Sequence, residues 1–329
     1  MNIVRFWIKN ARFKSLPQSF LPAVLAVCLA SKVERFSIWL GLLAIIGVSV
    51  GHLGINLFDD YFDYKVKKSD FRDIMVKKGF RARTTKCYYI TSKQTTLGQL
   101  LIACVVFCAF ALLIGLIIWF FRKNFILYLA IITAILGISY SGPPLRLSYH
   151  GLGEFVIGIV FGPLLMIGVY YAACGKADPS VFFISIPVGM LVANIVYVHS
   201  IMDYEPDKEI GKMTLAVLLK DKRLMLIFVF LLLIISFGCI LGGVITGYLS
   251  VYYLFVLFTL PMAVSLLYLM VQFIYYPKKK FSPRFWMGPM GDWQQIKTMD
   301  IDWFLIRWFL ARNMLSFFCF IIIVVCLFV

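Results

Sequence analysis

Acidic residues gather in two short windows of this chain. Of its 16 carboxylates, five lie between Asp59 and Asp73 and four between Asp203 and Glu209. Each window follows a long apolar run, and a charge near the core of a bilayer costs on the order of a few kcal/mol. Residues kept at such a cost usually serve function, so the two windows are the first candidates for a site.

The spacing inside each window places its acids on one face of a helix. Asn56, Asp60 and Asp63 are spaced i, i+4 and i+7. Asp203 and Asp207 are spaced i and i+4. Residues at these spacings are neighbours on a helix surface, so two such faces from separate helices can converge on one site. The simpler alternative is that the acids only solvate loop ends and balance nearby lysines.

Carboxylates in this arrangement suit Mg²⁺, which proteins usually bind through one or two carboxylates and substrate phosphates. The expected metal ligands are Asp60, Asp63, Asp203 and Asp207. Basic side chains near the windows would neutralise phosphate oxygens, and the candidates are Lys67, Arg72, Arg146 and Lys212. Metal, cations and a membrane-embedded cavity together favour a lipid diphosphate, which releases an allylic cation when its bridging oxygen is polarised.

The elements that carry these windows are predicted to be membrane-spanning helices. The chain has 329 residues, 62% of them hydrophobic and 15% charged, with a mean hydropathy of +0.90, whereas soluble domains are about half apolar and a quarter charged. A spanning helix needs about 20 mostly apolar residues. We therefore predict one domain over residues 1–329, an all-α polytopic membrane protein with about nine transmembrane helices around a central cavity. The nine runs are 16–32, 36–58, 95–121, 124–141, 152–174, 180–202, 223–246, 250–276 and 304–329.

Basic residues set the predicted orientation. The net charge is +16, but the lysines and arginines sit in short loops, which favours contact with lipid headgroups of the bilayer over nucleic acid. They are dense in the N-terminal segment and in the loops after the second, sixth and eighth runs. This alternation predicts a cytoplasmic N-terminus and a site that faces the cytoplasm. A cation transporter, the rival class, would hold its carboxylates near the middle of the membrane.

Three further residues are candidate substrate contacts. Tyr140 and Arg146 lie in the loop between the fourth and fifth runs, on the same predicted side as the acidic windows. The alternatives for them are an interfacial aromatic and a topology-setting arginine. Asn194 lies inside the sixth run, where an amide contacts either substrate or a neighbouring helix. Aromatic residues make up 17% of the chain, which suits a cavity that shelters an isoprenoid chain and an allylic cation.

Both acidic windows resemble motifs of a known family. NLFDDYFD and DYEPDKEIGKMTLAV are similar to the two cytoplasmic Asp-rich motifs of the UbiA superfamily of intramembrane aromatic prenyltransferases, whose members have nine transmembrane helices. The resemblance implies a Mg²⁺-dependent transfer of a polyprenyl group from an allylic diphosphate to an aromatic acceptor. It also implies that the metal and diphosphate are held by the matching residues Asn56, Asp60, Asp63, Asp203, Asp207 and Lys212.

Three other stretches are similar to one branch of this family, the 1,4-dihydroxy-2-naphthoate polyprenyltransferases of menaquinone biosynthesis. They are WIKNARFKSLPQSFLP at Trp7–Pro22, YSGPPLRLSYHGLGE at Tyr140–Glu154 and LARNMLSF around Arg312. This branch implies 1,4-dihydroxy-2-naphthoate as the acceptor, loss of its carboxylate on prenylation, and a place in the inner membrane of a prokaryotic cell. The alternatives inside the family are 4-hydroxybenzoate and a glycerol phosphate lipid precursor.

Two positions differ from the usual pattern of this branch. Asp59 stands where the branch usually has Asn, and Met202 stands where it usually has Arg, just before Asp203. Both lie beside the predicted metal and diphosphate site, so they bear on the identity of the acceptor.

Overall fold

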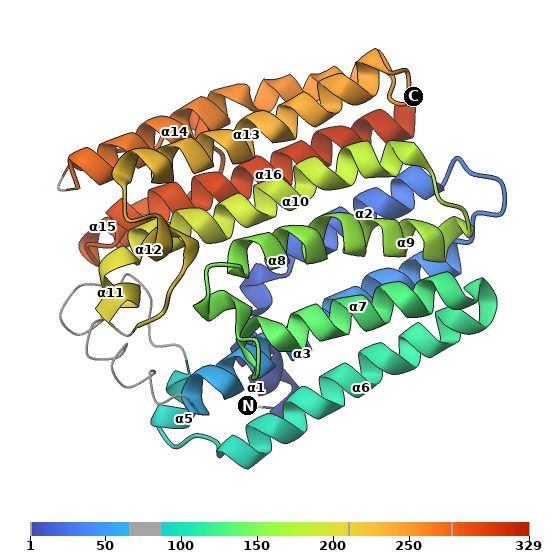
Figure 1. Ribbon diagram of the computed structural model, residues 1–329, viewed down its shortest axis with the longest axis horizontal. Coiled ribbons are helices and arrows are strands. Elements are labelled where there is room, and N and C mark those ends of the chain that lie inside the picture. Colours follow the sequence, from blue (N-terminus) through green and yellow to red (C-terminus); the bar gives the residue numbers. More distant parts are fainter. Residues whose placement is uncertain (1, 66–86, 210, 278, 329) are drawn as a thin grey trace.

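The computed structural model describes residues 2–65, 87–209, 211–277 and 279–328. Over these residues the chain is built from helices that run side by side (Figure 1), and its β structure amounts to one bridge between His150 and Met213. Eight helical segments are long and apolar enough to cross a membrane, which confirms the predicted all-α polytopic architecture. They are α3 (Ile38–Lys65), α6 (Leu97–Arg122), α7 (Asn124–Ser141), α8 to α9 (Gly153–Cys174), α10 (Pro179–Met202), α13 (Lys222–Ile245), η4 to α14 (Val251–Tyr275) and α16 (Asp302–Phe328).

Two of these segments are interrupted. The π-helical turn η3 (Val160–Leu164) joins α8 (Gly153–Ile159) to α9 (Leu165–Cys174) and contains a proline. Proline removes a backbone donor and clashes with the preceding turn, so the regular hydrogen-bond ladder breaks there. The second interruption is the 3-10 helix η4 (Val251–Thr259), which leads into α14 (Leu260–Tyr275).

The first predicted run forms a helix that is shorter than a membrane span. α2 (Pro17–Ala30) has 14 residues, which corresponds to about 21 Å, against about 30 Å for the hydrocarbon core of a bilayer. Eight of the nine predicted runs therefore have spanning length by themselves, and this one does not. The chain before it turns through η1 (Phe13–Ser15), and this turn carries the residues around Arg12 to the acidic end of α3.

α10 is the central helix of the bundle. In its apolar window 72% of the residues are buried, against 11% in α7. Small residues allow α10 to approach α8 and η3 closely: a Cβ added at Gly162 would lie 2.5 Å from Cα of Gly189 and 2.6 Å from the carbonyl oxygen of Ser185. Such small-residue crossings are typical of helices that pack inside a membrane. This crossing fixes the second acidic window, which begins where α10 ends, relative to the start of α8.

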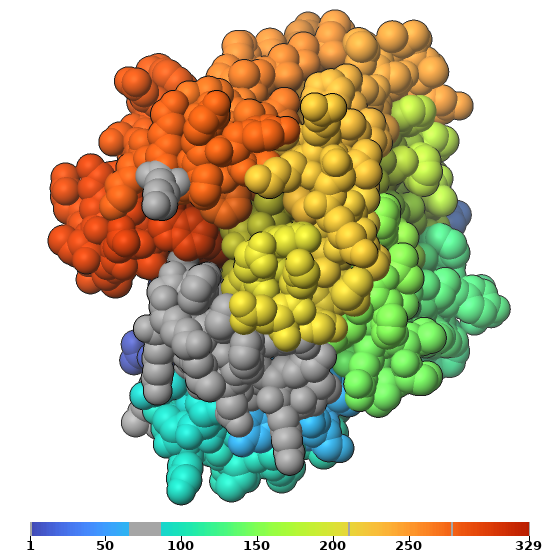
Figure 2. All heavy atoms as spheres, turned by 60° about the vertical axis from the view of Figure 1, so that its left-hand side comes forward, coloured from blue at the N-terminus to red at the C-terminus, as the bar shows by residue number. Residues whose placement is uncertain are grey.

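Short helices gather at the end of the bundle opposite the C-terminus (Figure 1). Figure 2 turns this end forward and shows α11 and α12 in yellow beside the orange surface of the segment that contains α14 and α15. Asp59, Asp60 and Asp63 of the first acidic window lie in the last turns of α3, and the second window runs from the end of α10 through α11. The short elements are α1 (Ile3–Asn10), α5 (Tyr88–Thr91), η2 (Leu147–Tyr149), α11 (Tyr204–Glu209), α12 (Leu215–Leu219), η5 (Phe285–Met287) and α15 (Trp293–Thr298).

Candidate active site

A cavity of about 2000 Å³ lies among α3, α6, α7, α8, α9 and α10. At the end with the short helices its lining is polar and charged, and includes Arg12, Asn56, Asp59, Asp60, Tyr140, Glu154, His199, Asp203, Asp207 and Lys212. Along the helices the lining becomes apolar, with residues such as Ala44, Gly47, Ile114, Gly115, Ala130 and Leu165. A cavity of this kind can hold a molecule with an anionic head and a long hydrocarbon tail.

The carboxylates of the first window are buried and held by tyrosines. Asp60 is 2% exposed and accepts a hydrogen bond from the Tyr89 hydroxyl at 3.0 Å. Burial and the charge of Asp60 raise the pKa of Tyr89 well above its ordinary value, so the hydroxyl stays a donor. Asp63 is also 2% exposed and accepts from the Tyr149 hydroxyl at 2.5 Å. Within the described part of the chain, Asp60 lines the cavity and Asp63 does not.

The carboxylates of the second window reach the same cavity from α10 and α11. Asp203 and Asp207 are both 3% exposed and line it. Nδ1 of His199 lies 3.3 Å from the Asp203 carboxylate. The backbone N–H of Lys212 donates to the Asp207 carbonyl at 2.8 Å, and the Lys212 ammonium lies 5.4 Å from the centre of the Tyr149 ring. Because Tyr149 also holds Asp63, it connects the two windows.

The donor set fits Mg²⁺ that binds together with a diphosphate. Among the described residues, no group of three or more His, Cys, Asp or Glu side chains is close enough to hold an ion by itself. Asp60 and the pair Asp203 and Asp207 instead offer carboxylates from separate elements of one cavity wall. Proteins commonly bind Mg²⁺ through one or two carboxylates, with substrate phosphates and water completing the octahedron.

Asn56 anchors the N-terminal segment to α3. Its Nδ2 donates to the carbonyl of Ala11 at 3.0 Å and to Oγ of Ser15 at 3.2 Å. The residue lines the cavity as predicted, but its amide protons are used by the protein itself. The amide nitrogen of Asn56 therefore positions the N-terminal segment, and a contact of Asn56 with substrate stays a prediction.

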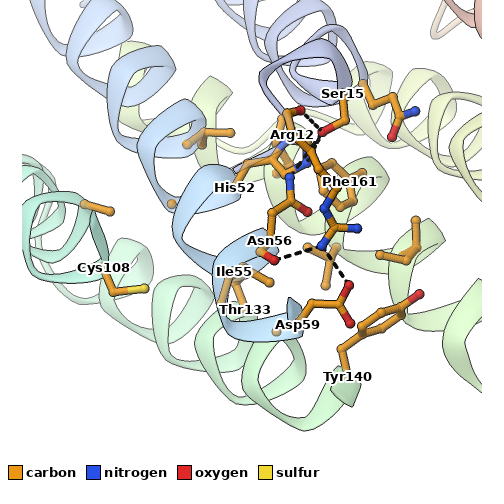
Figure 3. A pocket seen from close by; sticks show the side chains of 18 of the residues that line it. Arg12, Ser15, His52, Ile55, Asn56, Asp59, Cys108, Thr133, Tyr140 and Phe161 are labelled. Atoms are coloured by element: carbon orange, nitrogen blue, oxygen red, sulfur yellow. Dashed lines mark hydrogen bonds and ion pairs between the residues drawn. The ribbon is translucent and has the colours of Figure 1, made fainter. Parts of the chain in front are cut away.

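Arg12 is a site residue that the sequence analysis missed (Figure 3). Its Nη2 lies 2.8 Å from Asp59 Oδ2, 2.8 Å from the carbonyl oxygen of Asn56 and 3.3 Å from Asp60 Oδ1. Burial disfavours the charge of Arg12, yet the attraction of Asp60 and Asp59 raises its pKa above the ordinary value. In the sequence, Arg12 stands out only as one of the basic residues of the N-terminal segment, which predict topology. The signal that points to it is its place inside WIKNARFKSLPQSFLP.

The remaining residues predicted to contact substrate lie in different places. Tyr140 lines the cavity. Arg146 and Asn194 are not part of the described lining, and their role as substrate contacts stays a prediction. Arg146 is half-buried at the start of η2, and Asn194 is fully buried inside α10. Lys67 and Arg72 lie outside the described residues.

Glu154 also belongs to the cavity wall, although the sequence did not mark it for catalysis. It is 2% exposed and its Oε1 accepts a hydrogen bond from Oγ of Ser200 at 2.7 Å. Met202, one of the two departures from the branch pattern, does not line the large cavity. It lines a separate cavity of about 440 Å³ with Tyr204 and Lys208.

Known proteins are similar to this chain in sequence. The sequence model of the UbiA prenyltransferase family matches residues 19–288. The 1,4-dihydroxy-2-naphthoate octaprenyltransferase of Bacillus subtilis (strain 168) is 26% identical over 260 residues, which covers 76% of this chain and 77% of the relative.

Solved structures are similar to it in fold. A digeranylgeranylglyceryl phosphate synthase superposes with a TM-score of 0.65 at 17% identity and covers 100% of both chains. A UbiA homolog from Archaeoglobus fulgidus, bound to DMAPP and Mg²⁺, superposes with a TM-score of 0.57 at 14% identity, over 97% of this chain and 99% of that one. At these identities the likeness concerns the fold alone.

Proposed function

The chain belongs to the UbiA prenyltransferase family and is an integral membrane transferase, and on that premise we propose that it transfers a polyprenyl group from an allylic diphosphate to 1,4-dihydroxy-2-naphthoate, in menaquinone biosynthesis. One observation carries the proposal. Asp60 from α3, Asp203 from the residue after α10 and Asp207 from α11 line the polar end of a single cavity whose remaining length is apolar. The diphosphate would bind at the polar end and the polyprenyl tail along the apolar part.

The choice of acceptor rests on sequence similarity. The Bacillus subtilis relative carries the name of a 1,4-dihydroxy-2-naphthoate octaprenyltransferase. The stretches at Trp7–Pro22 and Tyr140–Glu154, which resemble that branch, both contribute residues to the polar end of the cavity. The acceptor ring would therefore meet the diphosphate between these stretches, next to the acidic windows.

Different residues around the cavity would then bind the metal ion and neutralise the diphosphate. Mg²⁺ bound with the diphosphate would neutralise its charge and polarise its bridging oxygen, held by Asp60, Asp203 and Asp207. Asp63 is a further candidate ligand, oriented by Tyr149. Lys212 lines the same wall and supplies a cation for the phosphate oxygens. Lys67 and Arg72 are further candidates for this role.

The bond changes follow from these positions. The C–O bond between the first prenyl carbon and the diphosphate breaks, and the diphosphate keeps the electron pair. A ring carbon of the acceptor then bonds to the allylic cation, and loss of the acceptor's carboxylate as CO₂ accompanies the transfer. The apolar part of the cavity excludes water, which would otherwise capture the cation.

The proposed orientation places the N-terminus and the polar end of the cavity on the cytoplasmic side of a prokaryotic inner membrane, with residues 1–329 acting as one domain. The support is the alternation of basic loops. Labelling of single cysteines introduced at Lys9 and at Lys123 tests it in intact cells. An impermeant thiol reagent is expected to reach position 123, which lies between α6 and α7, and to leave position 9 unmodified.

Product analysis tests the reaction itself. Purified protein is incubated with Mg²⁺, labelled farnesyl or octaprenyl diphosphate, and in parallel 1,4-dihydroxy-2-naphthoate, 4-hydroxybenzoate or a glycerol phosphate lipid precursor. We expect prenylated naphthoquinol and diphosphate release with the first acceptor, and neither product when EDTA is present. A prenylated product with one of the other two acceptors would show that 1,4-dihydroxy-2-naphthoate is the wrong acceptor. Ion flux in liposomes, without diphosphate release from any mixture, would instead support the transporter.

A further inference from the structure

Asp59 lies next to Asp60 in the chain but has different partners. Its Oδ2 lies 2.8 Å from Nη2 of Arg12, and its Oδ1 accepts a hydrogen bond from the Ser141 hydroxyl of α7. Figure 3 shows the Asp59 carboxylate turned toward the Arg12 guanidinium, with the Tyr140 ring beside it. The contact to Arg12 is shorter than that from the same nitrogen to Asp60, which is 3.3 Å.

The backbone holds Arg12 at this place. Arg12 has a left-handed conformation with φ 62°, which residues other than glycine and asparagine rarely adopt, and such strain persists where surrounding contacts enforce it. The contacts come from Asn56, whose Nδ2 binds the Ala11 carbonyl and the Ser15 hydroxyl and whose carbonyl accepts from Arg12. The guanidinium is therefore brought to the carboxylates by the fold of the N-terminal segment.

A guanidinium at this place can compete with a metal ion. Asp60 is a proposed ligand of Mg²⁺, and a full Arg12–Asp60 ion pair would use the carboxylate oxygens that the metal needs. A hydrogen bond between two charged groups is strong enough to lower metal affinity by a factor of about ten. Asp59 offers Arg12 a second carboxylate at shorter range.

We propose that Asp59 is a positioning residue that draws the Arg12 guanidinium away from Asp60, so that Asp60 can bind Mg²⁺ while Arg12 stays at the edge of the diphosphate site. The inference rests on the proposed function, because it takes Asp60 as a metal ligand. It gives the acid at position 59 a role other than metal binding, and it explains the use of Arg12 at a site that is already rich in carboxylates.

A double-mutant cycle on the full-length protein in detergent tests this role. Binding of Mn²⁺, in the presence of inorganic diphosphate, is measured by electron paramagnetic resonance for the wild type, Asp59→Asn, Arg12→Gln and the double variant. In Asp59→Asn, Arg12 moves onto Asp60 and the affinity for Mn²⁺ falls about tenfold. Arg12→Gln removes the competitor, so affinity rises about threefold. The double variant binds Mn²⁺ at least as well as the wild type.

The double variant is expected to regain the Mn²⁺ affinity that Asp59→Asn loses. If Asp59 had only a structural role, removing Arg12 would not restore this affinity. The role is overturned if Asp59→Asn binds Mn²⁺ like the wild type, if the double variant is as weak as Asp59→Asn, or if Arg12→Gln alone weakens binding. Asp300→Asn, at an exposed acid of the loop before α16, is the matched control and keeps wild-type affinity. If Asp59→Asn fails to fold, Arg12→Gln still tests the competition on which the role depends, and weaker Mn²⁺ binding in that variant overturns it.

Failure of the premise is distinguishable from failure of the inference. Asp60→Asn is expected to abolish Mn²⁺ binding with diphosphate. If it does not, or if the wild type binds no Mn²⁺ in the presence of diphosphate, the proposed metal site falls and the role of Asp59 falls with it. If Asp60→Asn abolishes binding and the cycle shows no reversal, only the role of Asp59 is wrong.

Discussion

At the residue scale, the acidic windows depend on hydrogen-bond donors that come from other segments. Tyr89 of α5 holds Asp60, Tyr149 of η2 holds Asp63, and His199 of α10 lies against Asp203. A buried carboxylate without such a partner is costly, because desolvation disfavours its charge. These donors orient the carboxylates before any metal arrives, and losing such a partner typically lowers metal affinity or activity about 10- to 100-fold.

Tyr89→Phe tests this dependence. The substitution removes the donor to Asp60 and leaves the ring, so we expect the concentration of Mg²⁺ for half-maximal activity to rise about tenfold, the usual effect of losing a partner of a metal ligand. Tyr276→Phe, at an exposed tyrosine outside the described lining of the cavity, is the control and keeps the wild-type requirement. Because the pKa of Tyr89 is raised, its hydroxyl stays protonated up to pH 10, and the difference between the two variants is expected to be constant from pH 7 to pH 9. Equal Mg²⁺ requirements in both variants would contradict the role of Tyr89.

Asp207→Asn tests the second window. The amide keeps the size of the side chain but removes its charge, so kcat/KM is expected to fall more than about a hundredfold, since charge neutralisation at the diphosphate is lost. Glu209→Gln, at an exposed acid of the same short helix, is expected to stay within about twofold of wild type. Retention of full activity by Asp207→Asn would remove this residue from the metal site.

At the scale of elements, hydropathy predicts where a helix lies along the chain but not which of its faces meets the cavity. Ile195 and His199 line the cavity, whereas Asn194 is buried away from it. α10 is apolar nearly all round and has no polar stripe that would mark a face. The acidic windows were predictable because their acids repeat at helical spacing. This local pattern by itself shows that the acids share one face of a helix.

The crossing of α10 with η3 gives a prediction at this scale. A Cβ at Gly162 would meet backbone atoms of Gly189 and Ser185 at 2.5 and 2.6 Å, and backbone cannot rotate out of the way as a side chain can. Gly162→Ala is therefore expected to separate the helices and destabilise the protein by about 1–3 kcal/mol. Gly242→Ala on α13, where the nearest atom lies 4.0 Å away, is the control and should keep or slightly raise the thermal unfolding temperature in detergent. An unfolding temperature of Gly162→Ala equal to that of the control would show that the crossing is loose.

At the scale of the whole molecule, the part of the site that escaped prediction is the part built from distant segments. Arg12 and Asn56 are 44 positions apart, and they meet where the chain turns through η1 before α2 begins. No local pattern in the sequence predicts that this turn brings Arg12 to α3. The bundle itself was predictable, because a bilayer requires long apolar runs with internally satisfied backbones. Eight of these runs were found as helices of spanning length.

The length of the cavity gives the last prediction. Gly115 lines its apolar part, and the adjacent Ile114 packs against Gly47 of α3, which lies about 20 Å along the helix from Asp60 at 1.5 Å per residue. A Cβ at Gly115 meets nothing within 4 Å, so a side chain can start at this position without a clash at its first carbon. Gly115→Phe would close the path of a long tail at this depth and leave room for a short one.

Gly115→Phe is therefore expected to lower the activity with octaprenyl diphosphate at least about tenfold relative to geranyl diphosphate, since a tail excluded from the apolar part loses roughly 25 cal/mol of burial energy per Å². Gly238→Phe on α13 is the matched control, because a Cβ there also meets nothing within 4 Å and the residue is not part of the described lining of the cavity. Competition assays with the two labelled diphosphates measure the ratio directly. An unchanged ratio in Gly115→Phe would mean that the tail does not reach this depth of the cavity.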